Sequence, residues 1–395
     1  MAIQFADRMD GVEDSFIREI LKVTENPEII SFAGGLPNPA LFPVEQVAVA
    51  AEKVIREQGS CVLQYATTEG YLPLREYIAN RYQEKSGLEI DPSEILIVNG
   101  SQQGIDLVSK ILLNKGDKVL IEEPGYLGAI QAISLYQPQF LSASLLNDGI
   151  DLQQVERILK NHSIKLMYSV PNFQNPAGIT YSREKRTGLA NLLKVYGVHL
   201  LEDNPYGDLR FSGENLPPIK STLKELGILL GSFSKVTVPG IRLGWVCADS
   251  EIMRKIKVVK QAADLHSNYM AQRILYQYLV DNDLDEHVSK INQAYKKQKE
   301  CMVACMEQSF PESVTFTRPE GGMFLWGELP ERFSTFELFE KAIKKNVAFV
   351  PGRAFHLDGK GDNTFRLNFS NSNEELIKKG IACLADVIKE YLAEK

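Results

Sequence analysis

The sequence predicts an α/β protein with a large, doubly wound, mostly parallel sheet domain and a smaller α+β domain. Two observations predict this fold. From residue 94 to the segment around Lys235, short β-rich runs alternate with helical stretches, a pattern typical of parallel strands joined by crossover helices. Beyond residue 266, long helical stretches lead into short strands and a final helix, which indicates a second, smaller unit.

The expected elements follow one another in a regular order. The strands of the large domain are expected at residues 94–98, 118–123, 138–144, 164–170, 197–203 and 228–234, with one more after Lys235. Its helices are expected at residues 102–113, 126–136, 152–161 and 182–196. The smaller domain is expected to contain helices 271–284, 285–310 and 374–392 and a strand within 364–371.

Size, composition and charge narrow the class of protein. A chain of 395 residues favours two domains over one. Hydrophobic residues make up 44% and charged residues 24%, as in an ordinary globular protein, and no apolar run approaches the roughly 18 residues of a membrane helix. The amino-terminal sequence lacks the pattern of a signal peptide, so we expect a cytoplasmic location. A formal net charge of −7 argues against binding to nucleic acid.

The five cysteines are scattered. Cys301 and Cys305 lie on one face of an expected helix, but no histidine or second cysteine pair completes a metal site beside them. We therefore expect reduced thiols and no bound metal.

Chemically distinctive residues follow the expected strands, where ligands of doubly wound sheets bind. Ser101 and Gln102 open a helix after the first strand, which is compatible with an anion site, although a serine helix cap is the more ordinary explanation of this turn taken alone. Tyr126 follows the second strand as a ring platform or a core tyrosine, and Asn175 lies in a loop after the fourth. Asp203 ends the fifth strand, where a buried carboxylate needs a cationic partner.

Lys235 ends the sixth strand, and Arg242 lies seven residues beyond it. Taken alone, this segment fits a polar hairpin with an exposed lysine as well as a functional lysine. Together with the other strand ends it supplies an anion cradle, a ring platform, an amide, a carboxylate and a lysine that can trap an aldehyde. Pyridoxal phosphate is a ligand that needs this set.

At these residues the chain resembles the fold-type I pyridoxal-phosphate-dependent aminotransferases of class I/II, and within them the subgroup that acts on 2-aminoadipate, kynurenine and aromatic amino acids. Nine motifs match in order from about residue 15 to the end: SFAGGLPNPALFP, LQYATTEGYLPLREYI, VNGSQQGIDL, EEPGYLGA, PNFQNPAG, EDNPYGDLRF, GSFSKVTVPGIRLGW, RPEGGMFLW and FRLNFS.

The resemblance implies a role for each site residue. Lys235 would bond to the cofactor aldehyde and later move the substrate proton, while Asp203 would pair with the pyridine nitrogen. Asn175 and Tyr206 would bind the ring hydroxylate, and Tyr126 would stack on the ring. The expected phosphate ligands are Ser101, Gln102, Ser232, Ser234, Arg242 and, from the neighbouring subunit of a homodimer, Tyr65.

The resemblance also implies residues that bind the amino acid and 2-oxo acid substrates. Arg366 would bind the α-carboxylate, because a guanidinium gives a planar, bidentate contact. Asn175 and Gly35 would also face the substrate. Arg18 either meets a side-chain carboxylate of the substrate or is an exposed helix residue. We expect an amino-terminal arm and helix at residues 1–40 that packs with the small domain, a large domain at 41–270 and a small domain at 271–395.

Three alternatives remain beside an aminotransferase that uses 2-oxoglutarate. Ser232 and Lys235 fit the S-x-x-K motif of penicillin-recognising enzymes, but the companion SDN and KTG motifs do not occur. The same fold serves as the effector-sensing part of transcription regulators, which carry an additional DNA-binding domain for which the matched region leaves no room. A lyase reaction with the same cofactor shares most of these residues.

Overall fold

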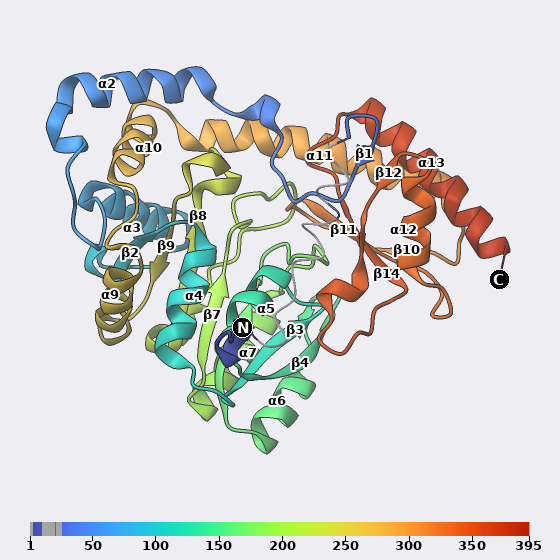
Figure 1. Cartoon of the computed structure of the whole chain (residues 1–395), viewed down its shortest axis with the longest axis horizontal. Helices are drawn as coiled ribbons and strands as arrows, with labels where there is room; N and C mark the ends of the chain where they lie inside the picture. Colours follow the sequence, from blue (N-terminus) through green and yellow to red (C-terminus); the bar gives the residue numbers. More distant parts are fainter. Residues whose placement is uncertain (1–2, 10–19, 21–25, 395) are drawn as a thin grey trace.

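The computed structural model describes residues 3–9, 20 and 26–394, and its largest sheet has eight strands (Figure 1). Their order is β2-β9-β8-β7-β6-β3-β4-β5. The bounds are β2 (Ile95–Val98), β3 (Lys118–Glu123), β4 (Gln139–Leu146), β5 (Gly149–Ile150), β6 (Ile164–Ser169), β7 (His199–Asp203), β8 (Gly227–Ser232) and β9 (Gly244–Cys247).

Strand direction brings the predicted site residues to one edge of this sheet. Strands β8, β7, β6, β3 and β4 pair in parallel, whereas β9 pairs antiparallel with both β8 and β2. Strand β2 therefore runs in the same direction as β8, and the carboxyl end of β2 lies at the same edge of the sheet as the carboxyl ends of the parallel strands. Because β9 runs the other way, its beginning, just after Arg242, lies at this edge too.

Helices cover both faces of the sheet, as the alternation of buried side chains along the strands shows. Along β3, Val119 and Ile121 belong to one buried cluster, and Leu120 belongs to another. The first cluster includes α4 (Ser101–Leu112) and α5 (Leu127–Ser134), and the second includes α6 (Leu152–Asn161) and α7 (Arg183–Tyr196). A parallel sheet buried on both sides is the doubly wound arrangement that the sequence predicts.

A second, smaller unit follows in the chain. Its antiparallel sheet has the order β10-β11-β14-β13. These strands are β10 (Thr315–Phe316), β11 (Phe324–Glu328), β13 (Val350–Pro351) and β14 (Thr364–Asn368), and the helices are α11 (Leu284–Ser309), α12 (Thr335–Ile343) and α13 (Glu374–Ala393). Strand β1 (Ile30–Ser31) pairs in parallel with β12 (Val347–Ala348), which ties the amino-terminal segment to this unit.

The α/β fold with an additional α+β unit is confirmed, and the structure adds several helices that the sequence pattern left undescribed. These are α2 (Val44–Val62), α3 (Leu72–Ser86), the short α8 (Lys220–Leu223) and α9 (Ser250–Asp264). Helix α10 (Tyr269–Asp281) packs against α2 (Figure 1). The domain boundaries after residues 40 and 270 stay a prediction. Within the described residues, no helix is both long and apolar enough to cross a membrane.

One strand ends earlier than predicted, and the difference orients Lys235. Strand β8 ends at Ser232 instead of residue 234, and Phe233–Lys235 form a single 3-10 turn. The turn begins where it does because the Ser232 hydroxyl accepts a hydrogen bond from the Ser234 N–H at 3.1 Å. Lys235 therefore leaves the plane of the sheet at its carboxyl edge.

Candidate active site

A cavity of about 510 Å³ lies at the carboxyl edge of the large sheet and is closed by residues of the smaller unit. The structure brings to its walls twelve of the residues predicted from the sequence: Gly35, Ser101, Gln102, Tyr126, Asn175, Asp203, Tyr206, Ser232, Ser234, Lys235, Arg242 and Arg366. Tyr65 does not line this cavity, and its side chain is 79% exposed. Arg18 lies outside the described residues.

Lys235 is the only lysine among the described residues that line the cavity. Its Nζ donates a hydrogen bond to the main-chain oxygen of Gly35 at 2.9 Å. Burial lowers the pKa of Lys235 to about 8, and the charges of Arg366 and Arg242 act in the same direction. A useful fraction of the amine is therefore neutral near pH 7, which is the form that attacks a carbonyl or accepts a proton.

Asp203 is a buried carboxylate in which one of the two oxygens has a hydrogen-bond partner. It ends β7 and is 2% exposed, and its Oδ2 accepts a hydrogen bond from the Tyr168 hydroxyl at 2.8 Å. Its Oδ1 is buried without a hydrogen-bond partner among the described residues. Burial raises the pKa of Asp203 to about 7. A cationic N–H placed at Oδ1 would satisfy this atom and restore the ionised form.

We expect Asp203→Asn to stabilise the cofactor-free protein in a pH-dependent way. The pKa of Asp203 rises on folding from an ordinary 3.8 to about 7, so the folded chain holds its proton more tightly than the unfolded chain. The stability contributed by this proton is lost as pH rises through that window. Asparagine does not titrate. The free energy of unfolding of the variant, relative to that of the wild type, should therefore increase as the pH rises from about 4 to 7. Urea unfolding at several pH values measures this difference, and a difference that does not change with pH would refute the prediction.

Arg366 is a buried guanidinium without a carboxylate partner in the described part of the chain. It lies on β14 and is 3% exposed. Its Nη1 donates to Asn175 Oδ1 at 2.8 Å and its Nη2 donates to the Ala33 oxygen at 2.7 Å, while its Nε has no partner. The group also lies 4.4 Å from the ring centre of Phe324. Burial lowers the pKa of Arg366 to about 10, and a bound carboxylate would compensate for the lost hydration.

Asn175 and Tyr206 lie side by side in the cavity wall. The Asn175 Nδ2 donates to the Tyr206 hydroxyl at 3.3 Å, while its Oδ1 accepts from Arg366. The Tyr206 ring packs edge-on against Phe324, which fixes its plane. Both side chains present polar atoms to a ligand from positions that Arg366 and Phe324 hold in place.

The turn from β2 into α4 is built for an anion. Gly100 has φ +79°, and an added Cβ would lie 2.7 Å from Arg242 Nη2, so only glycine fits here. Helix α4 begins at Ser101, and the first residues of the helix, whose N–H groups have no partner within a helix, line the cavity. Arg242 itself has a left-handed backbone, φ 55°, and its guanidinium donates to the main-chain oxygens of Pro239 and Asn99 at 3.3 and 3.4 Å.

The side chain of Gln102 joins this turn to the next helix. Its side-chain Nε2 donates to the Gly128 oxygen at 2.7 Å, which ties α4 to α5. Its main-chain N–H therefore remains the group with which it would bind an anion.

The residues of the cavity fit a flat, phosphorylated cofactor with a cationic ring nitrogen and a carbonyl group. Asp203 Oδ1 lacks a donor, the first turn of α4 with Arg242 supplies an anion site, and Lys235 supplies an amine. Tyr126 is available as a ring platform at the end of β3, where it lines the cavity. The sequence predicted the carboxylate, the anion site, the lysine and the ring platform, and the structure adds the observation that Asp203 Oδ1 has no donor.

Sequence reasoning missed the residues that hold the functional groups in place. Tyr168 binds Asp203 from the neighbouring strand β6, and Phe324 and Phe355 sandwich Arg366 at 4.4 and 5.2 Å. A signal for Tyr168 was present, because it is the one aromatic residue in β6, the strand that pairs with the strand of Asp203. The two phenylalanine rings gave no such signal.

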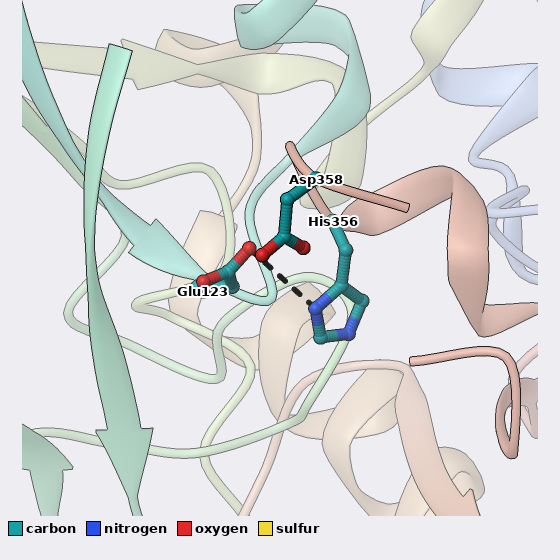
Figure 2. Close-up of side chains that lie close together, drawn as sticks. All are labelled: Glu123, His356 and Asp358. Atoms are coloured by element: carbon teal, nitrogen blue, oxygen red, sulfur yellow. Dashed lines mark ion pairs between the residues drawn. The ribbon is translucent and has the colours of Figure 1, made fainter. Parts of the chain in front are cut away.

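Glu123, His356 and Asp358 form the one group among the described residues whose ligand atoms could share a metal ion (Figure 2). Glu123 lies at the end of β3, whereas His356 and Asp358 come from the smaller unit. Glu123 Oε1 is 3.6 Å from His356 Nδ1, and Asp358 forms an ion pair with Lys360. We interpret the group as a link between the two units, because Glu123 also accepts hydrogen bonds from the Ser142 hydroxyl and the Leu357 N–H, and Asp358 already pairs with Lys360.

Comparison with known proteins agrees with this geometry. The profile of the family described as aminotransferase class I and II matches residues 29–384. The chain is 40% identical to aromatic-amino-acid aminotransferase 1 of Thermococcus litoralis, over 98% of this chain and 94% of the relative. It is also 40% identical to the 2-aminoadipate transaminase of Thermus thermophilus, over 97% of this chain and 96% of the relative.

A solved structure extends the similarity to the fold and the cofactor. The alpha-aminoadipate aminotransferase of Thermus thermophilus, complexed with N-(5'-phosphopyridoxyl)-L-leucine, superposes with a TM-score of 0.92 at 38% identity and covers 99% of this chain and 98% of its own. Its bound molecule joins the two chemical classes, a phosphopyridoxyl ring and an amino acid, that the cavity described above fits.

Proposed function

Because the chain belongs to the class I and II aminotransferases, which transfer amino groups with pyridoxal phosphate, we propose that its donor is an L-amino acid with a 2-aminoadipate-like or aromatic side chain. The proposed acceptor is 2-oxoglutarate, and the two half-reactions follow one another in a ping-pong sequence. The observation that carries the proposal is the presence in one cavity of Lys235 with two unsatisfied buried groups, the Oδ1 of Asp203 and the Nε of Arg366.

Each of these residues has a task that follows from its surroundings. When bound, the cofactor supplies an electrophilic carbonyl carbon and a ring that withdraws electrons from the substrate. Arg366 would bind the α-carboxylate and orient the Cα–H bond. Lys235 would accept the proton from Cα, for which its pKa of about 8 suits it near neutral pH. Asp203 would pair with the ring nitrogen and favour its protonated form.

The remaining residues hold the cofactor in position. Asn175 and Tyr206 would donate hydrogen bonds to the ring hydroxylate, and Tyr126 would stack on the ring. The N–H groups of the first turn of α4 would bind the phosphate together with Arg242 and the hydroxyls of Ser101, Ser232 and Ser234. These roles rest on the positions of the residues around the cavity and on the family.

The proposed choice of donor rests on two relatives and on space in the cavity. One relative is named for aromatic amino acids and the other for 2-aminoadipate. Gly35 lies where a Cβ would come within 3.1 Å of the Phe324 ring, so its lack of a side chain leaves room beside the cofactor. Arg18 stays our candidate for the residue that binds a side-chain carboxylate of the substrate. Equal turnover of acidic and aromatic donors by Arg18→Ala would show that Arg18 does not have this role.

We propose a homodimer in which Tyr65 reaches the phosphate of the partner subunit. Tyr65 is exposed and does not line its own cavity, and large apolar side chains are exposed near it in the sequence, including Val49, Ile55 and Leu63. Exposed apolar side chains in one segment favour burial of this segment against another chain. Sedimentation velocity measures the assembly, and a monomer at micromolar concentration would contradict the proposal. A cytoplasmic location remains part of the proposal.

An absorbance spectrum of the purified protein tests the proposed donors. Loaded with pyridoxal phosphate, the protein should show a visible band from the cofactor joined to Lys235. Added alone, a true donor should convert this band to the near-ultraviolet band of the aminated cofactor, and 2-oxoglutarate should then restore it. Aspartate and alanine serve as comparison amino acids. A band that no amino acid shifts would contradict the donor assignment, and release of ammonia would favour a lyase.

A further inference from the structure

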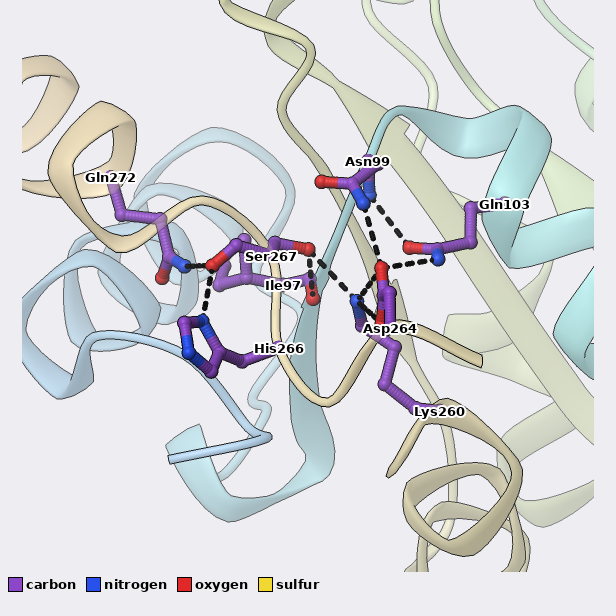
Figure 3. Close-up of polar contacts among 8 residues, drawn as sticks. All are labelled: Ile97, Asn99, Gln103, Lys260, Asp264, His266, Ser267 and Gln272. Carbon is purple, nitrogen blue, oxygen red and sulfur yellow. Dashed lines mark hydrogen bonds and ion pairs between the residues drawn. The ribbon is translucent and has the colours of Figure 1, made fainter. Parts of the chain in front are cut away.

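Lys260 is a lysine with no solvent exposure that lies outside the cavity (Figure 3). It is near the end of α9, and its Nζ donates to both carboxylate oxygens of Asp264, at 2.6 and 2.7 Å, and to the Ser267 hydroxyl at 3.0 Å. All three donors of the ammonium are therefore used. The Lys260 side chain is fully buried and that of Asp264 is 24% exposed. An ion pair that removes an ammonium from water gives little net stability compared with apolar side chains of the same size, so its presence calls for another explanation.

Asp264 passes the effect of this ion pair to the anion-binding turn. Its Oδ2 also accepts hydrogen bonds from Asn99 Nδ2 and Gln103 Nε2, both at 2.7 Å (Figure 3). Gln103 Oε1 in turn accepts from the Asn99 N–H at 2.9 Å. These contacts hold the residues on both sides of Gly100 and Ser101, and the Asn99 oxygen is also an acceptor for Arg242.

The carboxylate of Asp264 would be unfavourable beside a phosphate without a counter-charge. Asn99 and Gln103 flank the turn whose N–H groups line the cavity, so Asp264 is placed directly behind the anion site. Lys260 neutralises this carboxylate and leaves its lone pairs free to orient the two amides. The ion pair therefore fixes the side chains of Asn99 and Gln103 and adds no net charge behind the turn.

A second arm of the same network leads to Tyr65. Ser267 donates to the Ile97 oxygen in β2 at 3.1 Å, and the preceding residue, His266, accepts from the Ala66 N–H at its Nε2 at 3.2 Å. The Tyr65 ring lies edge-on to His266 at 5.9 Å. The segment from Asp264 to Ser267 therefore contacts both the turn that faces its own cavity and the tyrosine proposed to serve the partner.

We propose that Lys260 and Asp264 are a positioning pair that sets the phosphate-binding turn, and with it the segment of Tyr65, for recognition of the cofactor's phosphate. This inference rests on the cofactor site proposed above. Neither residue touches the cofactor. Their effect is on the phosphate end of the ligand and is absent for a ligand that lacks phosphate.

The test compares two ligands that differ in this group alone, pyridoxal phosphate and pyridoxal. Dissociation constants for both are measured by equilibrium dialysis on the wild type, Lys260→Met and Asp264→Asn. We expect pyridoxal phosphate to bind the variants roughly ten- to a hundredfold more weakly, the range known for residues that orient ligands of a bound group, and pyridoxal to bind unchanged. Gln103→Leu removes one neutral hydrogen-bond donor to Asp264. It is used in the same measurement if Lys260→Met or Asp264→Asn does not fold.

Lys290→Met is the matched control. Lys290 pairs with Glu286 at 2.7 Å with the same four-residue spacing, but both side chains are about two-thirds exposed, at 65% and 67%. It should change neither constant. If Lys260→Met weakens the binding of pyridoxal phosphate and of pyridoxal equally, or weakens neither, the proposal is overturned. If the wild type does not bind pyridoxal phosphate, the cofactor site itself fails, which is a different result.

Discussion

Replacement of Lys235 by alanine is expected to abolish amino transfer and covalent attachment of the cofactor while the protein stays folded. Lys235 is the only lysine among the described cavity residues, so no second amine can take its place. Loss of a general base alone lowers rates by about 10² to 10⁴, and loss of the covalent step adds to this. Steady-state kinetics gives the rate. Borohydride reduction followed by peptide mass spectrometry identifies the attached lysine.

Lys235→Arg separates the chemistry of the amine from its positive charge. Arginine keeps the charge, but its pKa stays above the range in which it could lose a proton. The structure therefore predicts that the arginine variant is as inactive as the alanine variant, although both can still bind the cofactor non-covalently through its phosphate. Activity of either variant close to that of the wild type would show that another residue carries out the proton transfer.

Removal of the Arg366 side chain is expected to have the second largest effect. In Arg366→Ala, the substrate carboxylate would enter a buried site without its cationic partner. Truncating one partner of such a pair costs about 2–5 kcal/mol, which corresponds to a fall in kcat/KM of roughly thirty- to several thousand-fold. Binding of pyridoxal phosphate should weaken less than binding of the substrate, because Arg366 acts on the cofactor only through its hydrogen bond to Asn175.

Two further variants make this result specific. Arg366→Lys keeps the charge and loses the bidentate geometry, so its kcat/KM should lie between those of the wild type and the alanine variant. Arg318→Ala is the control, since Arg318 is 57% exposed and pairs with Glu307 at 2.9 Å. A substrate amine without a carboxylate provides a further test. If Arg366→Ala loses as much activity toward this amine as toward amino acids, Arg366 has a different role.

The sequence was sufficient for the fold and for the polar strand-end residues that line the cavity, and the reason is the parallel sheet. Polar residues such as Asp203 and Lys235 interrupt apolar runs where strands end, and parallel strands end at one edge, so neighbours in space can be deduced from the pattern. Arg366, which comes from the antiparallel sheet of the other unit, was found only through resemblance to a family.

The partners of these residues could not be predicted in the same way. The contact of Arg366 with Ala33, 333 residues away in the chain, depends on how the amino-terminal segment crosses the smaller unit. The bond from Gln102 to Gly128 and the pairing of Lys260 with Asn99 and Gln103 through Asp264 depend on helix positions. Such contacts are set by packing in three dimensions, which no local pattern encodes.

The unsatisfied atoms of Asp203 and Arg366 also have a consequence for the lifetime of the protein in a cell. Each leaves a buried polar atom without a partner, and a bound cofactor or substrate completes the interior. Ligands that bind only the folded chain stabilise it in proportion to the logarithm of their concentration. Newly made chains that have not yet met the cofactor are therefore the population most open to proteolysis, and the supply of cofactor sets how much enzyme accumulates.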